Sequence, residues 1–538
     1  MEAAGIKRQA LCTESMSMSM SMIMITITTT GRSRLLYRPE NIKSREDMVM
    51  ISEMKRIPVA EGRHPFASAA KKCCFKEIGY VEDEYFMSGT ANVYEEDAFQ
   101  NPRVSIKDAP YTTRLLVRRP EDKERFSGNI VIEVLNATAM IDIDRMWVDT
   151  WRFFTRNGDI YIGITSKGQV VDALKRFDPE RYAPINWDNP DRSRTPIASI
   201  KDNPMLFLED YESGLFWDML IDLARLLRTE DGKNPLAAYG PAHLFLTGWS
   251  QSGGYIARIL HSFAYQPEIE KDGPLFDGYL LAGCGASDAP MNAYSSAFRF
   301  GQNGIPQGSV LGGKEPVIAV NTESENKYAY WYGDFDEPEF KFRTWQIPAS
   351  SHDTAYNLIE YYEGYQREDL TRLGFTNVWE GCEGEPMDCP YEPIFHAAFY
   401  HLYNWAIHGI PAPHAPKIET RIVRKKQASW GFFGNCVENL TDVLGNAVGG
   451  IRHPAVDCAT GTYASFSRRE DGTIQEMFGN VVPFSKEKLT ALYGSLDNYR
   501  RLAQESTDRA VAEGYVLRED ADWLVERVVS GAAGRGLG

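Results

Sequence analysis

The sequence predicts an α/β fold in which a mostly parallel central sheet is flanked by helices. Short apolar runs that are typical of buried strands alternate with longer segments whose apolar residues recur at helical spacing. One such strand, at 243–247, is joined to a helix at 255–264 by the glycine-rich turn 248–254. These observations together indicate the fold class.

The other elements follow from the same patterns, in chain order. Residues 80–94 are predicted to form a hairpin that turns at Ser88–Gly89. Residues 114–117 and 129–135 are predicted to be paired strands, joined through the charged segment 120–125. Further strands are expected at 159–164, 276–282, 316–320 and 341–347, and helices at 214–227, 393–408 and 485–529.

Residues 75–530 are expected to form a single decorated domain. Residues 1–60 are predicted to be a disordered N-terminal tail, because they include the low-complexity run Ser15–Met22. Two long excursions, 166–212 and 355–480, depart from the strand and helix pattern. Because long excursions of this kind commonly shape active sites, we expect them to form a cap.

Composition indicates a soluble protein. The chain has 538 residues, of which 43% are hydrophobic and 12% aromatic, enough for a large core. Its formal net charge of −16 disfavours nucleic acid and anionic membranes as partners. No apolar run is long enough to span a membrane, and no signal peptide is evident, so a cytoplasmic location is expected. None of the eight cysteines forms a C-x₂-C pair, so no metal site is expected.

The turn after the strand 243–247 carries a serine at its apex. Its sequence is Gly248-Trp-Ser-Gln-Ser-Gly-Gly254. A strand, a sharp turn with a serine and a helix form the setting of a nucleophile elbow. The turn is so tight that the residues two before and two after the serine must be small, and Gly248 and Ser252 meet this demand around Ser250.

The motif allows two registers. The usual pattern is G-x-S-x-G, but here the last position is Ser252. A register that runs from Ser250 to Gly254 makes Ser252 the nucleophile instead. We favour Ser250, because it lies two residues past the strand-ending Gly248.

A serine nucleophile needs a base, and His352 is the candidate. In a fold of this kind the chain order is serine, acid, histidine. His352 follows the predicted strand 341–347, at the end of the sheet where open α/β folds place their sites. Two other histidines, His243 and His261, belong to the elbow strand and helix and are expected to be structural. The histidines of the aromatic-rich helix have no i, i+4 pair that suggests a metal site; they are His396, His401 and His408.

The acid has three candidates. Glu325 is preferred, because it lies five residues past the strand 316–320, where this loop usually presents its carboxylate. Glu323 is the near alternative. Asp288, which follows the strand 276–282, is the third.

Two main-chain N–H groups are expected to form an oxyanion hole. One belongs to Gln251, the residue after the proposed nucleophile. The other is assigned to Ala137, in the loop after the strand 129–135, with Asn136 or Thr138 shaping that loop.

The chain resembles the large microbial α/β-hydrolase domain proteins that carry Gly-x-Ser-Gln-Ser-Gly at the elbow. The resemblance covers roughly residues 75 to 530, and its motifs are specific together though weak singly. Besides the elbow, it includes 79–94, 109–120, 126–136, 177–183, 449–452 and the helices at 485–529. It implies an α/β-hydrolase fold with inserted cap segments, serine hydrolase activity and no cofactor. By this resemblance Ser250 is the nucleophile, His352 the base, and Glu325 or Glu323 the acid.

The expected activity is therefore cleavage of a carboxylic ester of a small or medium-sized organic substrate, through an acyl-enzyme. A catalytically silent ligand-binding protein on the same fold is the alternative. Thioesterase, amidase and lactonase activity also remain open, because the same groups serve all acyl transfers. The sequence does not determine the oligomeric state.

Overall fold

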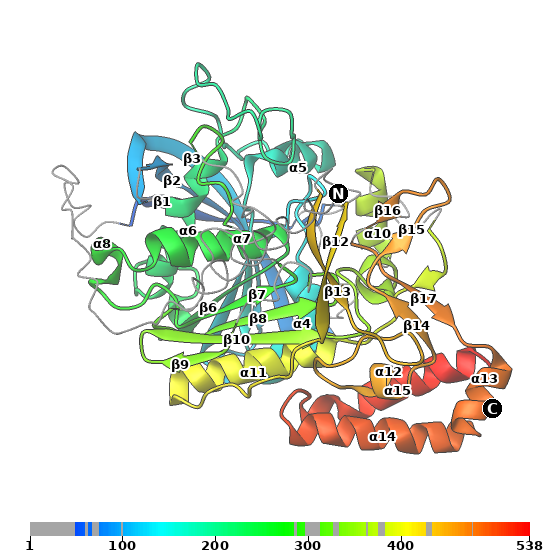
Figure 1. Cartoon of the computed structure of the whole chain (residues 1–538). Helices are drawn as coiled ribbons and strands as arrows, with labels where there is room; N and C mark the ends of the chain where they lie inside the picture. Colours follow the sequence, from blue (N-terminus) through cyan, green and yellow to red (C-terminus); the bar gives the residue numbers. More distant parts are fainter. Residues whose placement is uncertain are drawn as a thin grey trace, which may run out of the picture. The chain divides into compact units, whose positions relative to one another are not determined.

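A ten-stranded sheet forms the core of the computed structural model. The structure describes residues 49–59, 63–66, 75–97, 101–284, 288–295, 313–325, 333–361, 364–374, 382–426, 433–475 and 477–538. In space its strands follow the order β1-β2-β3-β5-β4-β6-β7-β8-β10-β9 (Figure 1). Their bounds are β1 (Ile51–Ile57), β2 (Tyr80–Glu96), β3 (Pro102–Pro120), β4 (Asn129–Val134), β5 (Ile160–Ile164), β6 (His243–Trp249), β7 (Gly278–Ala282), β8 (Val317–Thr322), β9 (Phe335–Glu337) and β10 (Phe340–Ile347).

The middle of the sheet is parallel, from β5 through β4, β6, β7 and β8 to β10. The edge strands β1, β2, β3 and β9 pair antiparallel. Every residue of β4, β5, β7 and β8 is buried. Such continuous burial is expected where helices cover both faces of a parallel sheet. The predicted fold class is confirmed.

Helices lie on both faces of the sheet. Helices α4 (Arg145–Asn157) and α11 (Glu392–His408) pack on one face, and α6 (Phe216–Leu227) and α7 (Gln251–Arg258) pack on the other (Figure 1). Shorter helices decorate the connections; they are α3 (Phe75–Ile78), α5 (Val171–Phe177), α8 (Pro267–Glu270), α10 (Gly364–Arg372) and α12 (Pro454–Asp457).

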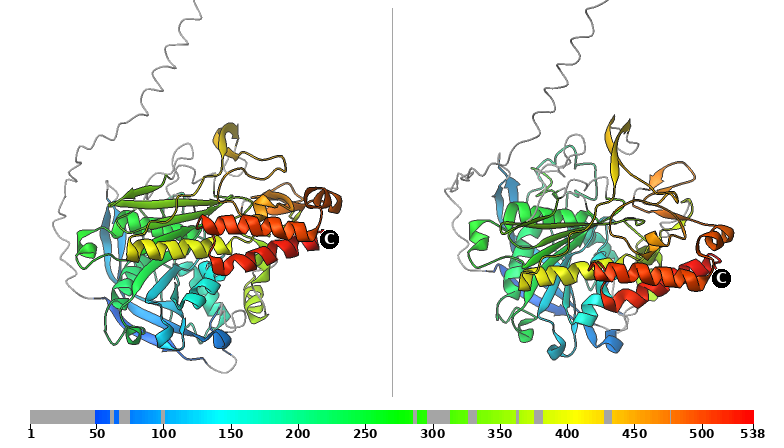
Figure 2. Two further views of the ribbon diagram at one scale, coloured as in Figure 1. Left: turned by 90° about the horizontal axis from the view of Figure 1, so that it is seen from below. Right: turned by 60° about the horizontal axis from the view of Figure 1, so that its bottom comes forward.

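Beyond α11 the chain adds small sheets and three helices. A three-stranded sheet joins β11 (Glu385–Pro386), β17 (Asn480–Pro483) and β14 (Gly461–Ala464), and two hairpins join β12 (Thr420–Lys426) to β13 (Phe433–Asn439) and β15 (Ser467–Arg468) to β16 (Ile474–Gln475). The last helices are α13 (Lys486–Tyr493), α14 (Leu496–Ala512) and α15 (Arg518–Gly534). Figure 2 shows α14 and α15 packed together next to α11. Residues 49–538 form one compact unit.

The predicted hairpin at Ser88–Gly89 is wrong. Strand β2 continues through these residues and pairs with β3 from Tyr80, opposite Pro120, to Glu96, opposite Pro102. Gly89 has another purpose, because a Cβ there would lie 2.4 Å from the carbonyl oxygen of Met50. Glycine at this position therefore allows the backbone of β1 to lie close to β2, and it does not form a turn.

The predicted pairing of 114–117 with 129–135 is also wrong. Residues 115–118 of β3 pair with β5, and β4 lies between β5 and β6. The chain crosses from β3 to β4 past the position that β5 later fills between them. Helix α4 then connects β4 to β5, because two neighbouring parallel strands need a crossover connection.

The N-terminal boundary is corrected as well. Residues 51–57, which fall in the predicted tail of 1–60, form strand β1 of the main sheet. Residues 1–48 lie outside the described part of the chain. Within the described residues, none of the helices is long and apolar enough to cross a membrane.

Buried ion pairs join the sheet edge to α4. The Arg118 side chain is fully buried, and its Nε donates to Glu82 Oε2 at 2.8 Å and its guanidinium also donates to Asp144. The guanidinium carbon lies 4.6 Å from the centre of the Trp147 ring. Because Asp144 sits directly before α4, Arg118 fixes where that helix starts.

Replacing Arg118 with Met is expected to lower the free energy of unfolding by about 3–5 kcal/mol, because it leaves two buried carboxylates without their cation. Urea denaturation measures the effect. Arg103→Met on the same strand is the matched control: Arg103 is 68% exposed and pairs with Glu95 at 3.7 Å, so a loss within about 1 kcal/mol is expected. Equal losses in the two variants contradict the argument.

Candidate active site

Ser250 lies at the strained apex between β6 and α7. Its φ of 58° and ψ of −121° are rarely adopted by a residue with a side chain. The Ser250 N–H donates to the Ala282 carbonyl on the neighbouring strand at 2.8 Å, and the Ser250 carbonyl accepts from Gly253. The side chain is half-buried. This is the backbone geometry that a nucleophile elbow needs.

Small residues make this turn sterically feasible. A Cβ on Gly248 would lie 2.9 Å from the Cβ of Ser252, and a Cβ on Gly253 would lie 2.4 Å from the sulfur of Cys284. Ser252 itself is buried, and its hydroxyl donates to the Leu135 carbonyl at 3.2 Å. Of the two serines, the structure therefore places Ser250 at the apex and Ser252 in the packing beneath it.

His352 and Glu325 are brought together by the loops after β10 and β8. The distance between His352 Nδ1 and Glu325 Oε1 is 2.7 Å, and both residues are buried. The second Glu325 oxygen accepts from the N–H and the hydroxyl of Thr322, at 2.8 and 2.6 Å. Glu325 is thus held on one side by its own strand and directed at the imidazole on the other.

The electrostatics of this pair favour its charged form. Burial opposes protonation of His352, but the charge and hydrogen bond of Glu325 outweigh it, so the pKa of His352 is raised. Burial likewise opposes ionisation of Glu325, but His352 and Thr322 outweigh it, so the pKa of Glu325 is lowered. The two directions agree with a carboxylate that stabilises an imidazolium.

The other two acid candidates lie elsewhere. Glu323 accepts from the Ala349 N–H at 2.9 Å and from the Asn439 side chain at 3.0 Å, and burial raises its pKa to about 7. Asp288 contacts His261 Nδ1 at 2.6 Å. Neither carboxylate bonds the imidazole of His352.

Two main-chain N–H groups close to the Ser250 turn have no acceptor among the described residues. Ala137 follows β4, and Gln251 opens α7. Within the described residues, neither main-chain N–H donates to a protein acceptor. Asn136 ties the two segments together, because its Nδ2 donates to the Trp249 carbonyl at 2.9 Å and its Oδ1 accepts from the Thr138 N–H.

Arg145 was not found from the sequence, although it opens the helix after the β4 loop. It is buried, and its guanidinium donates to the His352 carbonyl at 3.0 Å and to Asp353 Oδ1 at 2.8 Å. The same group donates to Asp149 on α4 at 2.9 Å. Arg145 therefore fixes the histidine loop against α4.

Trp249 is the second residue that the sequence did not single out. Its indole Nε1 donates to His352 Nε2 at 3.1 Å. The ring lies 4.4 Å from the guanidinium carbon of Arg145 and stacks on Tyr391 at 6.2 Å. Gly283 makes room for it, because a Cβ there would lie 2.7 Å from the indole. This contact requires the imidazole to be neutral at Nε2, with its proton on Nδ1 facing Glu325.

With this geometry established, comparison with known families identifies the class. The chain belongs to the alpha/beta hydrolase domain family, whose model matches residues 53–526. The predicted family is thereby confirmed. A comparison with curated proteins found no match.

Solved structures of hydrolases are similar in part. A putative dienelactone hydrolase from Klebsiella pneumoniae is 10% identical and covers 54% of this chain and 96% of its own, with a TM-score of 0.25. An esterase from Pyrobaculum calidifontis (10% identity, 47% and 70% covered, TM-score 0.23) and a putative carboxylesterase from Lactobacillus plantarum (10%, 41% and 74%, 0.25) are also similar. These likenesses carry no argument about a substrate.

Across the described ranges, no group of three or more His, Cys, Asp and Glu side chains is arranged to hold a metal ion.

Trp249→Phe is expected to raise the pKa of His352 by about 0.4–1 unit, because it removes a donor that binds only the neutral imidazole and is worth roughly 0.5–1.5 kcal/mol. An NMR titration of the histidine Cε1 signals, assigned with a His352 variant, measures the shift. Phe395→Leu is the control, because Phe395 packs on the same ring at 5.6 Å without a bond to His352. An unchanged pKa in Trp249→Phe argues against the bond.

Proposed function

We propose that this protein is a serine hydrolase that cleaves a carboxylic ester of a small or medium-sized organic substrate. Ser250 attacks the carbonyl, and His352 removes its proton. Glu325 keeps the imidazole in the required tautomer and stabilises the imidazolium that forms. Water then hydrolyses the acyl-enzyme, with His352 returning the proton.

One observation carries this proposal: the strained serine and the histidine–carboxylate pair lie at the same edge of the sheet, on the loops after β6, β10 and β8. Strain of this kind costs about 1–3 kcal/mol, so it persists only where the surrounding structure enforces it. The family assignment supports the same conclusion.

The N–H groups of Gln251 and Ala137 are proposed as the oxyanion hole. No described residue accepts a hydrogen bond from either N–H, which supports this role, since both are then available to a developing negative charge. Each such donor contributes about 3 kcal/mol to lowering the barrier. The N-terminal end of α7 adds a favourable dipole.

The bond from Trp249 to His352 Nε2 supports a second candidate, a catalytically silent ligand-binding protein. In that case the lone pair needed for general-base catalysis stays occupied. In the active enzyme the substrate displaces this contact, and the imidazole turns to Ser250. Thioesters, amides and lactones are attacked by the same groups and are separated only by assay.

Ser250→Ala is expected to abolish labelling by a fluorophosphonate probe, because the probe forms a bond to an activated serine. Mass spectrometry of the labelled wild-type peptide identifies the modified residue. Ser252→Ala is the matched control and should retain labelling. Label on Ser252 places the nucleophile in the other register, and a folded wild type that neither labels nor cleaves p-nitrophenyl esters supports the silent binding protein.

Glu325→Gln is expected to lower kcat on the order of 10⁴-fold, because an amide does not stabilise the imidazolium and favours the wrong tautomer. Glu323→Gln, two residues away and equally buried, should lower it less than about 3-fold, since at most one weak contact is changed. Steady-state kinetics on a p-nitrophenyl ester, at equal unfolding free energy, compares them. The reverse ranking makes Glu323 the acid.

A further inference from the structure

The chain segments 464–466 and 477–479 lie directly against the loops after β8 and β10. The Ser324 hydroxyl donates to the Ser465 carbonyl at 2.7 Å. The Asp353 N–H donates to the Met477 carbonyl at 2.9 Å. Each of these bonds is one residue away from a member of the histidine–carboxylate pair. The two segments therefore border the candidate active site on its histidine side.

The hairpin of β15 and β16, which these segments flank, has one buried and one exposed face (Figure 1). Ser467 of β15 is buried and pairs with Gln475 of β16. Because side chains alternate along a strand, Phe466 and Arg468 lie on the opposite face, together with Ile474, which pairs with Arg468. Phe466 is 46% exposed and Ile474 is 38% exposed. The outer face of the hairpin is thus apolar in part.

Exposed apolar side chains are concentrated at this place. Met477, which follows the hairpin, is 39% exposed. Of the ten large apolar side chains that are exposed among the described residues, three belong to the stretch 466–477. Single exposed apolar residues need no explanation, but a group of them beside a candidate active site is typical of a surface that binds a ligand. We call Phe466, Ile474 and Met477 the apolar rim.

The proposed mechanism decides which part of an ester meets the apolar rim. The carbonyl oxygen of the substrate faces the N–H groups of Gln251 and Ala137. His352 passes the proton of Ser250 to the departing alcohol, so the alcohol oxygen has to lie within hydrogen-bond reach of the imidazole. The alcohol part of the substrate therefore extends on the histidine side of the site, which is the side that the apolar rim borders.

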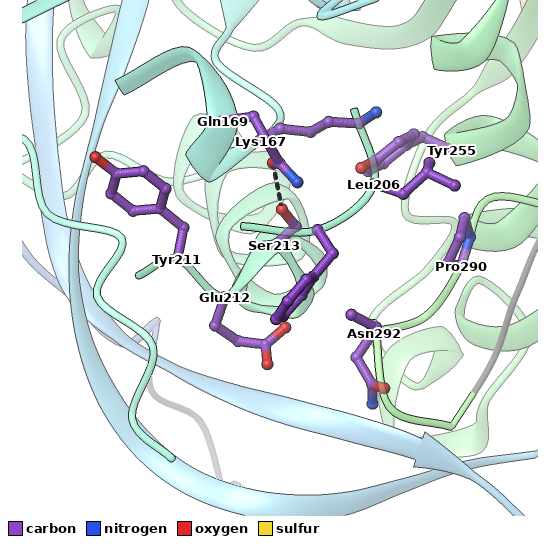
Figure 3. A pocket seen from close by; sticks show the side chains of 11 residues that line it. Lys167, Gln169, Leu206, Tyr211, Glu212, Ser213, Tyr255, Pro290 and Asn292 are labelled. Carbon is purple, nitrogen blue, oxygen red and sulfur yellow. Dashed lines mark hydrogen bonds between the residues drawn. The ribbon is translucent and has the colours of Figure 1, made fainter. Parts of the chain in front are cut away.

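The small cavity beside α7 offers no room for such a chain. Its volume is about 20 Å³, which is enough for roughly one water molecule. Its lining includes the polar side chains of Lys167, Gln169 and Glu212 (Figure 3). An alkyl chain is therefore accommodated better on the apolar rim than in this cavity.

We propose that the apolar rim binds the alcohol part of the substrate, and that the substrates are esters of apolar alcohols with a chain of several carbons. This proposal rests on the proposed function, because it names the substrate class of the same site. Contact with the rim removes methylene groups of the alcohol from water, which is favourable. The guanidinium of Arg468 donates to the Gly472 carbonyl in the hairpin turn at 3.4 Å, which leaves the apolar side chains as the surface for an uncharged chain.

Two ester series test the apolar rim. The first keeps the acetate and varies the alcohol (ethyl, hexyl and octyl acetate), and the second keeps the ethanol and varies the acid (ethyl acetate and ethyl hexanoate). Titration of the released acid gives kcat/KM below the solubility limit of each ester. The wild type should prefer hexyl over ethyl acetate by about 10-fold, because four methylene groups are partly removed from water. Phe466→Ser should lower this preference by about 3- to 10-fold and leave the ratio in the second series unchanged.

Ile410→Ser is the matched control and should leave both ratios unchanged. Ile410 is also exposed, but it follows the C-terminal end of the 17-residue helix α11, whose opposite end lies next to Trp249. Ile474→Ser repeats the test if Phe466→Ser does not fold. A preference for the longer alcohols that neither rim variant lowers overturns the proposal, and so does an effect confined to the acid series. A preference that arises only above the solubility limit assigns the rim to a lipid surface instead.

Binding of hexan-1-ol separates this proposal from the proposed function, because it requires no turnover. The NMR signal of the Met477 methyl group, assigned with Met477→Leu, should shift saturably with hexan-1-ol, and Phe466→Ser should weaken this binding. A saturable shift in a folded protein that hydrolyses no ester supports the rim although the proposed function fails. An unshifted Met477 signal in a protein that hydrolyses esters removes the rim alone.

Discussion

The strained turn at Ser250 is the constraint on which the rest of the site depends. A residue with φ of 58° persists only if its neighbours hold it. Here the hydrogen bond to Ala282 anchors the turn to β7, and Asn136 anchors the preceding residue to the loop after β4. A Cβ on Gly248 would lie 2.9 Å from that of Ser252, so glycine is needed at this position of the turn. The register of the parallel strands β4, β6 and β7 therefore sets the position of the Ser250 hydroxyl.

The position of the His352 loop depends on buried charged side chains instead. Arg145 fixes the His352 loop to α4. Helix α4 is in turn held by Asp520 of α15. Asp520 pairs with Arg156 at 2.8 Å and with His396 of α11 at 2.9 Å. Burial opposes the charge on Asp520, but its interactions with His396 and Arg156 outweigh it and lower its pKa. The C-terminal helices are thus part of the scaffold that positions His352, although they lie far from it in the sequence.

Trp249 connects the Ser250 turn with the His352 loop. It directly precedes the strained serine, and its indole N–H donates to Nε2 of His352. A single residue therefore links the conformation of the Ser250 turn to the protonation state of His352. In the proposed mechanism the imidazole has to leave Trp249 and turn to Ser250, and substrate binding provides the free energy for this movement.

Local patterns in the sequence determined the parallel strands, the serine turn and the order of acid and histidine, because each depends on a few neighbouring residues. Gly248 and Ser252 indicated a tight turn, and Glu325 was preferred from its distance along the loop. The hairpin at Ser88–Gly89 failed because a glycine that admits a neighbouring strand has the same local pattern as one in a turn. Only the tertiary structure decided the contacts of Arg145 and Trp249 with His352, since the two residues lie more than a hundred positions from His352 in the sequence.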